Sequence, residues 1–166
     1  MAAGKSTVAQ RLAERLPRSV HLRGDAFRKM IVSGRAEMTR ALSDEAAGQL
    51  ELRYRLAADA ARSYLEAGFW VVYQDIIVGE SLPRVIDALL AAPLFVIVLC
   101  PDAEVAAARD HERLKTGYSE AFTAEAFDRT LRGETPRLGL WLDTSALSVA
   151  ATVDAILAGL GTARVR

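Results

Sequence analysis

The first residues of the chain form a pattern that could bind phosphate. Residues 3–7 read AGKST, which matches the second half of G-x-x-x-x-G-K-[ST], the phosphate-binding P-loop. Gly4 would let the backbone approach a phosphate, Lys5 would bring a positive charge to the β and γ phosphates, and Ser6 would offer a hydroxyl to Mg²⁺. The first glycine of the full pattern would lie two residues before Met1.

A P-loop joins a buried strand to a helix, and only the helix is visible in this sequence. Val8, Leu12 and Leu16 recur at helical spacing, and Pro17 ends the pattern. No strand-like segment precedes the loop. We therefore expect either that the strand and the first glycine lie upstream of Met1, or that the protein lacks the strand and has a weakened loop.

Composition favours one domain, residues 1–166, that acts on a small molecule. The 166 residues are 51% hydrophobic, which is enough for a substantial core. The 21 basic and 21 acidic residues cancel, which argues against a nucleic-acid partner. No apolar stretch reaches the roughly 18 residues of a membrane span and no signal peptide is recognisable, so we expect a cytoplasmic protein with no membrane partner. The pattern does not indicate an oligomeric state.

Strand-like and helix-like segments alternate, which predicts an α/β fold with a mainly parallel sheet. The expected strands are 19–23, 69–73, 94–100 and 138–142. The expected helices are 26–32, 43–67, 81–90, one after 101–102, one after an N-cap at Thr123, and 148–160. The run of β-branched and aromatic residues at 69–73 is typical of a strand buried on both faces. Cys100, at the end of an apolar run, is expected to be buried rather than nucleophilic.

Two acidic residues follow expected strands, at the edge of a parallel sheet where ligands bind. Asp25 follows the first strand and Asp75 the second. Either could simply cap a helix. Phosphoryl transfer, however, needs one group to hold the metal and another to orient or deprotonate the attacking hydroxyl. We expect Asp25 to act on the hydroxyl and Asp75, which ends the more buried strand, to hold Mg²⁺ or its waters.

Three arginines could supply positive charge to such a site. Arg109 and Arg113 lie one helical turn apart and would present two guanidinium groups in the same direction, suited to polyphosphate. The alternative is a solvated helix face on which Asp110 and Glu112 are their neighbours. Arg28, three residues after Asp25, could reach substrate or phosphate.

Together these segments resemble the chloramphenicol phosphotransferase-like group of P-loop kinases, over nearly the whole chain. The resemblance rests on residues 4–7, 21–28, Asp75, the helix with Arg109 and Arg113, and 139–145. It implies a three-layer αβα P-loop NTPase fold whose first strand is missing here, and a lid around 109–122. It also implies ATP and Mg²⁺ as cofactors, and transfer of the γ-phosphate to a hydroxyl of a small molecule, for example an antibiotic such as chloramphenicol.

The resemblance also implies roles for individual residues. Asp25 is the candidate base, with Lys5, Arg109 and Arg113 as further catalytic residues. The expected ATP-binding residues are Ala3, Gly4, Lys5, Ser6, Thr7, Arg109, Asp143, Thr144 and Ser145. The expected substrate-binding residues are Asp25, Arg28 and Asp75, and the expected metal-binding residues are Ser6 and Asp75.

Two other functions remain open at this stage. Zeta toxins share an Asp-x-x-Arg pattern, here Asp25 and Arg28, and phosphorylate a nucleotide sugar, but they are usually longer. A nucleotide-binding protein without turnover is the other alternative. Loss of a central strand would leave buried backbone groups of its neighbours unpaired, at about 1–3 kcal/mol each.

Overall fold

Two pairs of parallel strands lie at the centre of the computed structural model, which describes residues 3–39, 41–111 and 123–166. β1 (Ser19–Arg23) pairs with β2 (Trp70–Gln74), with Ser19 opposite Trp70 and Arg23 opposite Gln74. β3 (Ile97–Leu99) pairs with β4 (Leu140–Leu142). Both pairings are parallel, as the alternation of strand-like and helix-like segments predicts.

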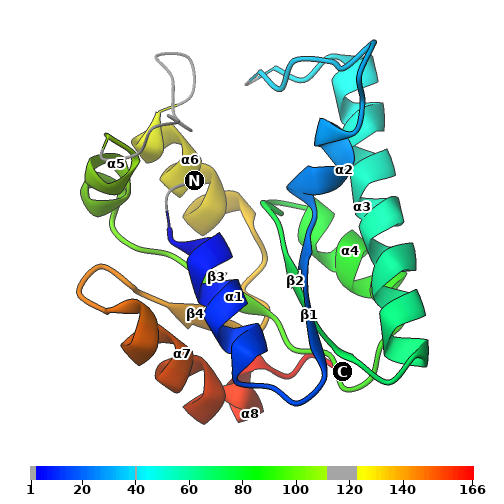
Figure 1. Ribbon diagram of the computed structural model, residues 1–166. Helices are drawn as coiled ribbons and strands as arrows, with labels where there is room; N and C mark the ends of the chain where they lie inside the picture. Colours follow the sequence, from blue (N-terminus) through cyan, green and yellow to red (C-terminus); the bar gives the residue numbers. More distant parts are fainter. Residues whose placement is uncertain (1–2, 40, 112–122) are drawn as a thin grey trace.

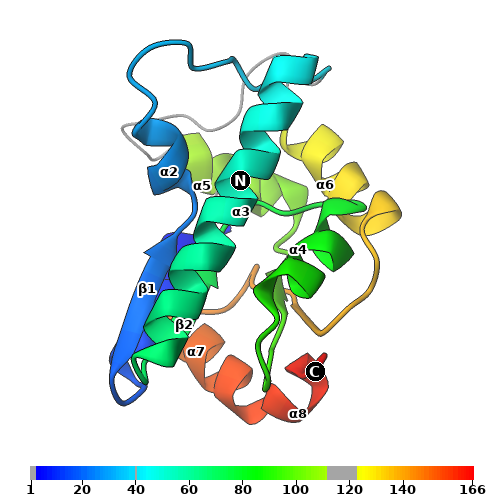
Figure 2. The same cartoon turned by 90° about the vertical axis from the view of Figure 1, so that its right-hand side faces the viewer.

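Helices cover both faces of the β1–β2 pair. α1 (Lys5–Glu14) packs on one face and also contacts α7 (Val149–Ala158). α3 (Asp44–Glu66) covers the opposite face and packs against α4 (Ser81–Leu89). Figure 2 shows α3 in front of these strands, whereas Figure 1 shows α1 on their other side. The three-layer αβα architecture is therefore confirmed. The remaining helices are α2 (Asp25–Lys29), α5 (Ala103–His111), α6 (Ala124–Glu134) and α8 (Leu160–Ala163).

The hydrophobic core lies between α1, α7 and the β3–β4 pair. Val8, Val153 and Ile156 form a buried cluster, against which side chains of β3 and β4 pack. Helix boundaries follow from capping residues: the Thr123 hydroxyl accepts a hydrogen bond from the Ala126 amide at the start of α6, as predicted. Within the described residues, no helix combines the length and apolar character that crossing a membrane requires.

Several expected elements are shorter than the sequence suggested, among them the strand expected over 138–142, which spans only Leu140–Leu142. The segment 94–100 forms a strand only at Ile97–Leu99, because the chain before it turns to a different partner: Phe95 bridges antiparallel to Arg164 near the C-terminus. The helix expected over 26–32 ends at Lys29, and a polar loop follows.

The two strand pairs do not join into one sheet. β1–β2 and β3–β4 are separate two-stranded sheets; in Figure 1, β3 and β4 pass behind α1, whereas β1 and β2 lie beside it. The prediction that the β2 segment is buried on both faces is wrong: its residues are half-buried and Trp70 is 45% exposed. No ladder within the described residues joins β2 to β3.

A version of the chain carrying an apolar strand and the P-loop glycine before Met1 should be more stable than the 166-residue chain. The added strand would pair backbone groups of β2 and β3, and each buried group left unpaired costs about 1–3 kcal/mol. Denaturant midpoints measure the difference, with a Gly/Ser extension of equal length as control. Equal midpoints for the two extended proteins would show that the space between β2 and β3 does not receive a strand.

Candidate functional site

A polar cavity of about 200 Å³ lies where the start of α1 meets the carboxyl ends of β1 and β2. Its lining residues are Gly4, Lys5, Ser6, Asp25, Arg53, Gln74, Asp75 and Ile76. The structure therefore brings the P-loop residues together with both carboxylates that follow strands. Sites for drug-sized ligands usually span roughly 300–1,000 Å³. This cavity has room for a phosphoryl group and a hydroxyl rather than for a whole nucleotide.

The P-loop residues approach the cavity from the N-terminal end of α1. Gly4 has a φ of 77°, in the left-handed region that favours glycine, and its carbonyl accepts the Val8 amide at 2.9 Å. The Ser6 hydroxyl donates to Gln74 Oε1 at 2.9 Å. Gln74 was not singled out from the sequence, although its position directly before Asp75 at a strand end was a usable signal. The contact fixes the Ser6 hydroxyl at the carboxyl end of β2.

Asp25 begins α2 and has one oxygen available for a ligand. Its Oδ2 accepts a hydrogen bond from Lys29 Nζ, and its Oδ1 lies 3.6 Å from Arg23 Nε. Oδ1 is buried and has no hydrogen-bond partner within the described residues. Burial acts to raise the pKa of Asp25, but the hydrogen bond and charge of Lys29, with Arg23 and Arg53, outweigh it and hold the pKa below its usual value. Asp25 is therefore ionised at neutral pH.

Asp75 is buried and fully engaged by neighbouring donors. Its side chain is 1% exposed and forms an ion pair with Arg53. Oδ2 accepts from Arg53 Nε and from the Tyr73 hydroxyl, each at 2.9 Å, and Oδ1 accepts from the Ile76 amide at 2.7 Å. Burial raises the pKa of Tyr73, which keeps its hydroxyl a donor. Direct binding of Mg²⁺ by Asp75 stays a prediction, and these contacts indicate a second role, which is to hold Arg53 in place.

Arg53 is a site residue that sequence reasoning missed. It lies on α3, its side chain is 11% exposed, and it lines the cavity beside Asp25. The only sequence signal was its place next to Tyr54, one of the apolar residues on the buried face of that helix. The ion pair also lies directly under the turn before α2, because a Cβ at Gly24 would collide with Asp75 Oδ2.

Arg28 lies on α2, one turn after Asp25, and not all of its hydrogen-bond donors have an acceptor within the described residues. Its Nη2 donates to the Ala36 carbonyl at 2.6 Å, whereas its Nε is buried and has no hydrogen-bond partner within the described residues. The same loop is held to α3 by Gln49, which donates to the Gly34 carbonyl at 2.7 Å and accepts from the Ala36 amide at 2.9 Å. These contacts hold Arg28 and its loop against α3, although Arg28 itself is not among the residues that line the cavity.

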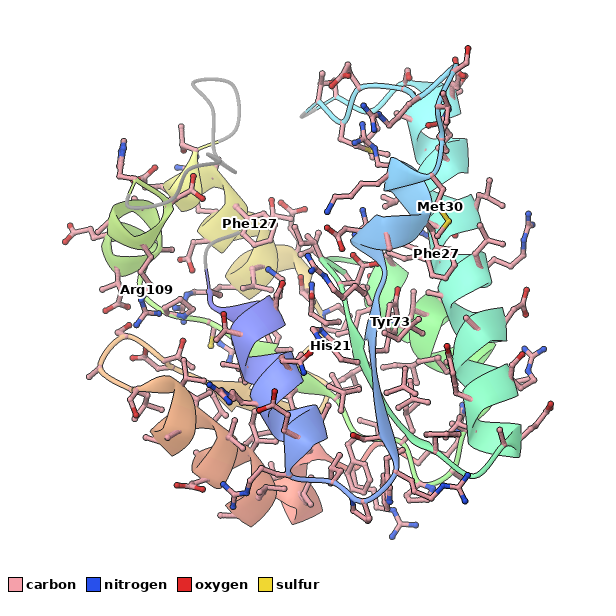
Figure 3. The ribbon with its side chains drawn as sticks, in the orientation of Figure 1. His21, Phe27, Met30, Tyr73, Arg109 and Phe127 are labelled. Carbon is pink, nitrogen blue, oxygen red and sulfur yellow. The ribbon has the colours of Figure 1, made fainter. Side chains whose placement is uncertain are left out.

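A second group of predicted ATP-binding residues meets away from this cavity. Arg109 Nη2 donates to the carbonyls of Thr144, at 2.9 Å, and Ser145, at 3.2 Å. Asp143 Oδ1 accepts from the Ser145 amide at 2.8 Å, and the hydrogen bonds from the Ser145 hydroxyl and amide lower the pKa of Asp143. Arg109, labelled in Figure 3, lies on α5, on the side of α1 away from β1. It is thus held by the loop rather than freely solvated. Arg113 and residues 112–122 of the expected lid lie outside the described residues.

The residues present fit a magnesium ion bound largely through nucleotide phosphates. In residues 3–39, 41–111 and 123–166, no group of three or more His, Cys, Asp and Glu side chains could hold a metal alone. Mg²⁺ in kinases is commonly held by one or two protein oxygens together with phosphates and water. The Ser6 hydroxyl lies at this cavity and is an oxygen of that kind.

Comparisons with known proteins agree with this fold. The family model AAA_33, described as an AAA domain, matches residues 1–136. A tunicamycin resistance protein from Deinococcus radiodurans has a TM-score of 0.67 at 23% identity, covering 99% of this chain and 92% of that one. A sugar kinase from Janibacter sp. has a TM-score of 0.66 at 20% identity, covering 98% and 90%. No curated protein sequence matches the chain significantly.

Proposed function

The chain belongs to the AAA_33 family, and from that premise we propose that it is a kinase that transfers the γ-phosphate of ATP to a hydroxyl of a small molecule. The observation that carries this proposal is the convergence of Lys5, Ser6 and Asp25 on one cavity. The fold is shared with a protein described as a sugar kinase, which supports an alcohol acceptor. The balanced charge of the chain supports a small acceptor rather than a nucleic acid.

The cavity residues divide the work of phosphoryl transfer among them. Bound Mg²⁺ would neutralise charge on the β and γ phosphates of ATP, and the Ser6 hydroxyl would hold it or its waters. Lys5 would bind oxygens of the β and γ phosphates. Asp25 Oδ1, which lacks a hydrogen-bond donor within the described part of the chain, would accept the hydrogen bond of the acceptor hydroxyl and orient it toward the γ-phosphate.

The loop that Arg109 holds would bind the rest of the nucleotide. Thr144 Oγ1 is buried without a hydrogen-bond partner within the described residues, so it could bond to the base or ribose of ATP. This arrangement would place ATP across α1, with its phosphates at Lys5 and its base near Asp143–Ser145. We propose a cytoplasmic location for such an enzyme, where ATP is abundant.

The test is transfer of labelled γ-phosphate from ATP to a panel of sugars, nucleotide sugars and hydroxylated antibiotics, with Mg²⁺ present. Labelled acceptor formed by the wild-type protein supports a kinase, and the best acceptor separates an antibiotic or sugar kinase from a zeta-like nucleotide-sugar kinase. Tight ATP binding with no acceptor labelled and no ADP released would instead support a nucleotide-binding protein without turnover.

A further inference from the structure

The acceptor side of the cavity carries excess positive charge. We define this side by six charged residues from four neighbouring segments. They are Arg23 at the end of β1, Asp25, Arg28 and Lys29 on α2, Arg53 on α3, and Asp75 directly after β2. Lys29 is paired with Asp25, and Arg53 is paired with Asp75. Arg23 shares Asp25 at 3.6 Å, and no ion pair of Arg28 is seen in the described part of the chain. This set holds four cations and two carboxylates, of which Asp25, Arg53 and Asp75 line the cavity.

Arg28 has a buried donor that lacks an acceptor. Its Nη2 donates to the Ala36 carbonyl, but its Nε is buried without a partner among the described residues. A buried donor left without an acceptor is unfavourable, and it is common where a ligand supplies the missing group. An acceptor oxygen placed beside Arg28 would remove this cost.

Arg53 presents a fixed guanidinium to the same region. Its Nε and Nη2 contact Asp75, so the guanidinium group cannot rotate freely. Its Nη1 takes no part in these contacts. Burial lowers the pKa of Arg53; the charge of Asp25 opposes this shift, and the charge of Arg28 adds a smaller contribution to it. Arg28 lies on α2, which packs against α3, so an anion held between the two guanidinium groups would be stabilised by both charges.

We propose that Arg28 and Arg53 bind a phosphate group of the acceptor, so that the acceptor is a phosphorylated molecule that also carries a free hydroxyl. The assignment rests on the proposed function, because it places the acceptor next to Asp25. Planar guanidinium forks match the oxygens of a phosphate and can hold it through several charge-assisted hydrogen bonds. The hydroxyl of the bound acceptor would then lie at Asp25 and face the γ-phosphate.

The experiment is a calorimetric titration of inorganic pyrophosphate into the chain saturated with a non-hydrolysable ATP analogue, with Mg²⁺ equimolar to the analogue. The analogue occupies the P-loop, so pyrophosphate reports on a second site. We expect one equivalent to bind, and Arg28→Met and Arg53→Lys each to weaken binding at least tenfold. Arg53→Lys keeps a charge opposite Asp75 and therefore protects folding. Arg62→Met, on an exposed residue of the same helix α3, is the matched control and should leave binding unchanged.

Several results would overturn the assignment. The first is that the wild-type protein, saturated with the ATP analogue, binds no pyrophosphate. The others are that either arginine variant binds pyrophosphate with wild-type affinity, or that Arg62→Met loses as much affinity as they do. Citrate binding as tightly as pyrophosphate would show that the site does not select phosphate. If the chain does not bind the ATP analogue, the proposed function is contradicted separately. Pyrophosphate is then titrated into Lys5→Ala protein, which lacks the P-loop cation, so that any binding reports on the arginine site alone.

Discussion

Asp25→Asn should lower the rate of phosphoryl transfer by about 10²- to 10⁴-fold, the usual contribution of a general base, while binding of ATP with Mg²⁺ survives. The amide keeps the shape of the carboxylate but cannot accept the proton of the acceptor hydroxyl. Oδ1 is the atom concerned, since it is buried at the cavity and receives no hydrogen bond within the described residues. Steady-state transfer and nucleotide titration of the same preparations measure the two effects.

The matched control for this variant is Asp59→Asn, on an exposed residue of α3 that pairs with Arg62 at 3.4 Å. It removes one carboxylate without touching the cavity and should transfer phosphate at the wild-type rate. Full activity of Asp25→Asn would remove Asp25 from the reaction. A loss of ATP binding as large as the loss of transfer would instead make Asp25 a nucleotide or metal ligand.

Asp75→Ala should lower the free energy of unfolding by about 3–5 kcal/mol, because it leaves the Arg53 guanidinium buried without its partner. The side chain of Asp75 is 1% exposed and that of Arg53 is 11% exposed, so the pair is largely shielded from water. Asp154→Ala is the control, since Asp154 is 64% exposed in its pair with Arg15 and such pairs contribute about 0–1 kcal/mol. Denaturant unfolding measures both.

A double variant separates the ion pair from packing. Replacing both partners, as Asp75→Leu with Arg53→Met, should recover much of the stability lost in Asp75→Ala, because no buried charge remains unpaired. If Asp75→Ala is as stable as the wild-type protein but needs a higher Mg²⁺ concentration for activity, Asp75 holds the metal and the role of anchoring Arg53 is contradicted.

Local sequence patterns predicted the elements that position the cavity because those elements depend on short-range rules. The strand expected at 19–23 is β1 with the same bounds, and the helix expected over 43–67 is α3 at Asp44–Glu66. The convergence of Asp25 and Asp75 followed from parallel strands, whose carboxyl ends meet at one edge. A parallel pairing was therefore sufficient to bring two residues 50 positions apart to the same cavity.

The parts that sequence reasoning missed depend on contacts between distant elements. Arg53 reads as one more polar residue of an amphipathic helix until α3 is packed on β2, where it meets Asp75. The length of β3 and the burial of β2 were also mispredicted, because both depend on which strands lie next to them. The apolar run at 69–73 indicated a strand correctly and its degree of burial wrongly, since burial is a property of the whole sheet.

The central claim is that Lys5 binds the phosphates of ATP, and titration of ATP with Mg²⁺ into wild-type, Lys5→Ala and Arg11→Ala proteins tests it most directly. Arg11 lies on the same helix, is 66% exposed and pairs with Glu14, so its removal controls for a lost positive charge. We expect wild-type affinity in Arg11→Ala, and at least tenfold weaker binding with no transfer in Lys5→Ala. Equal ATP affinity in all three proteins would contradict the P-loop assignment and the kinase proposal built on it.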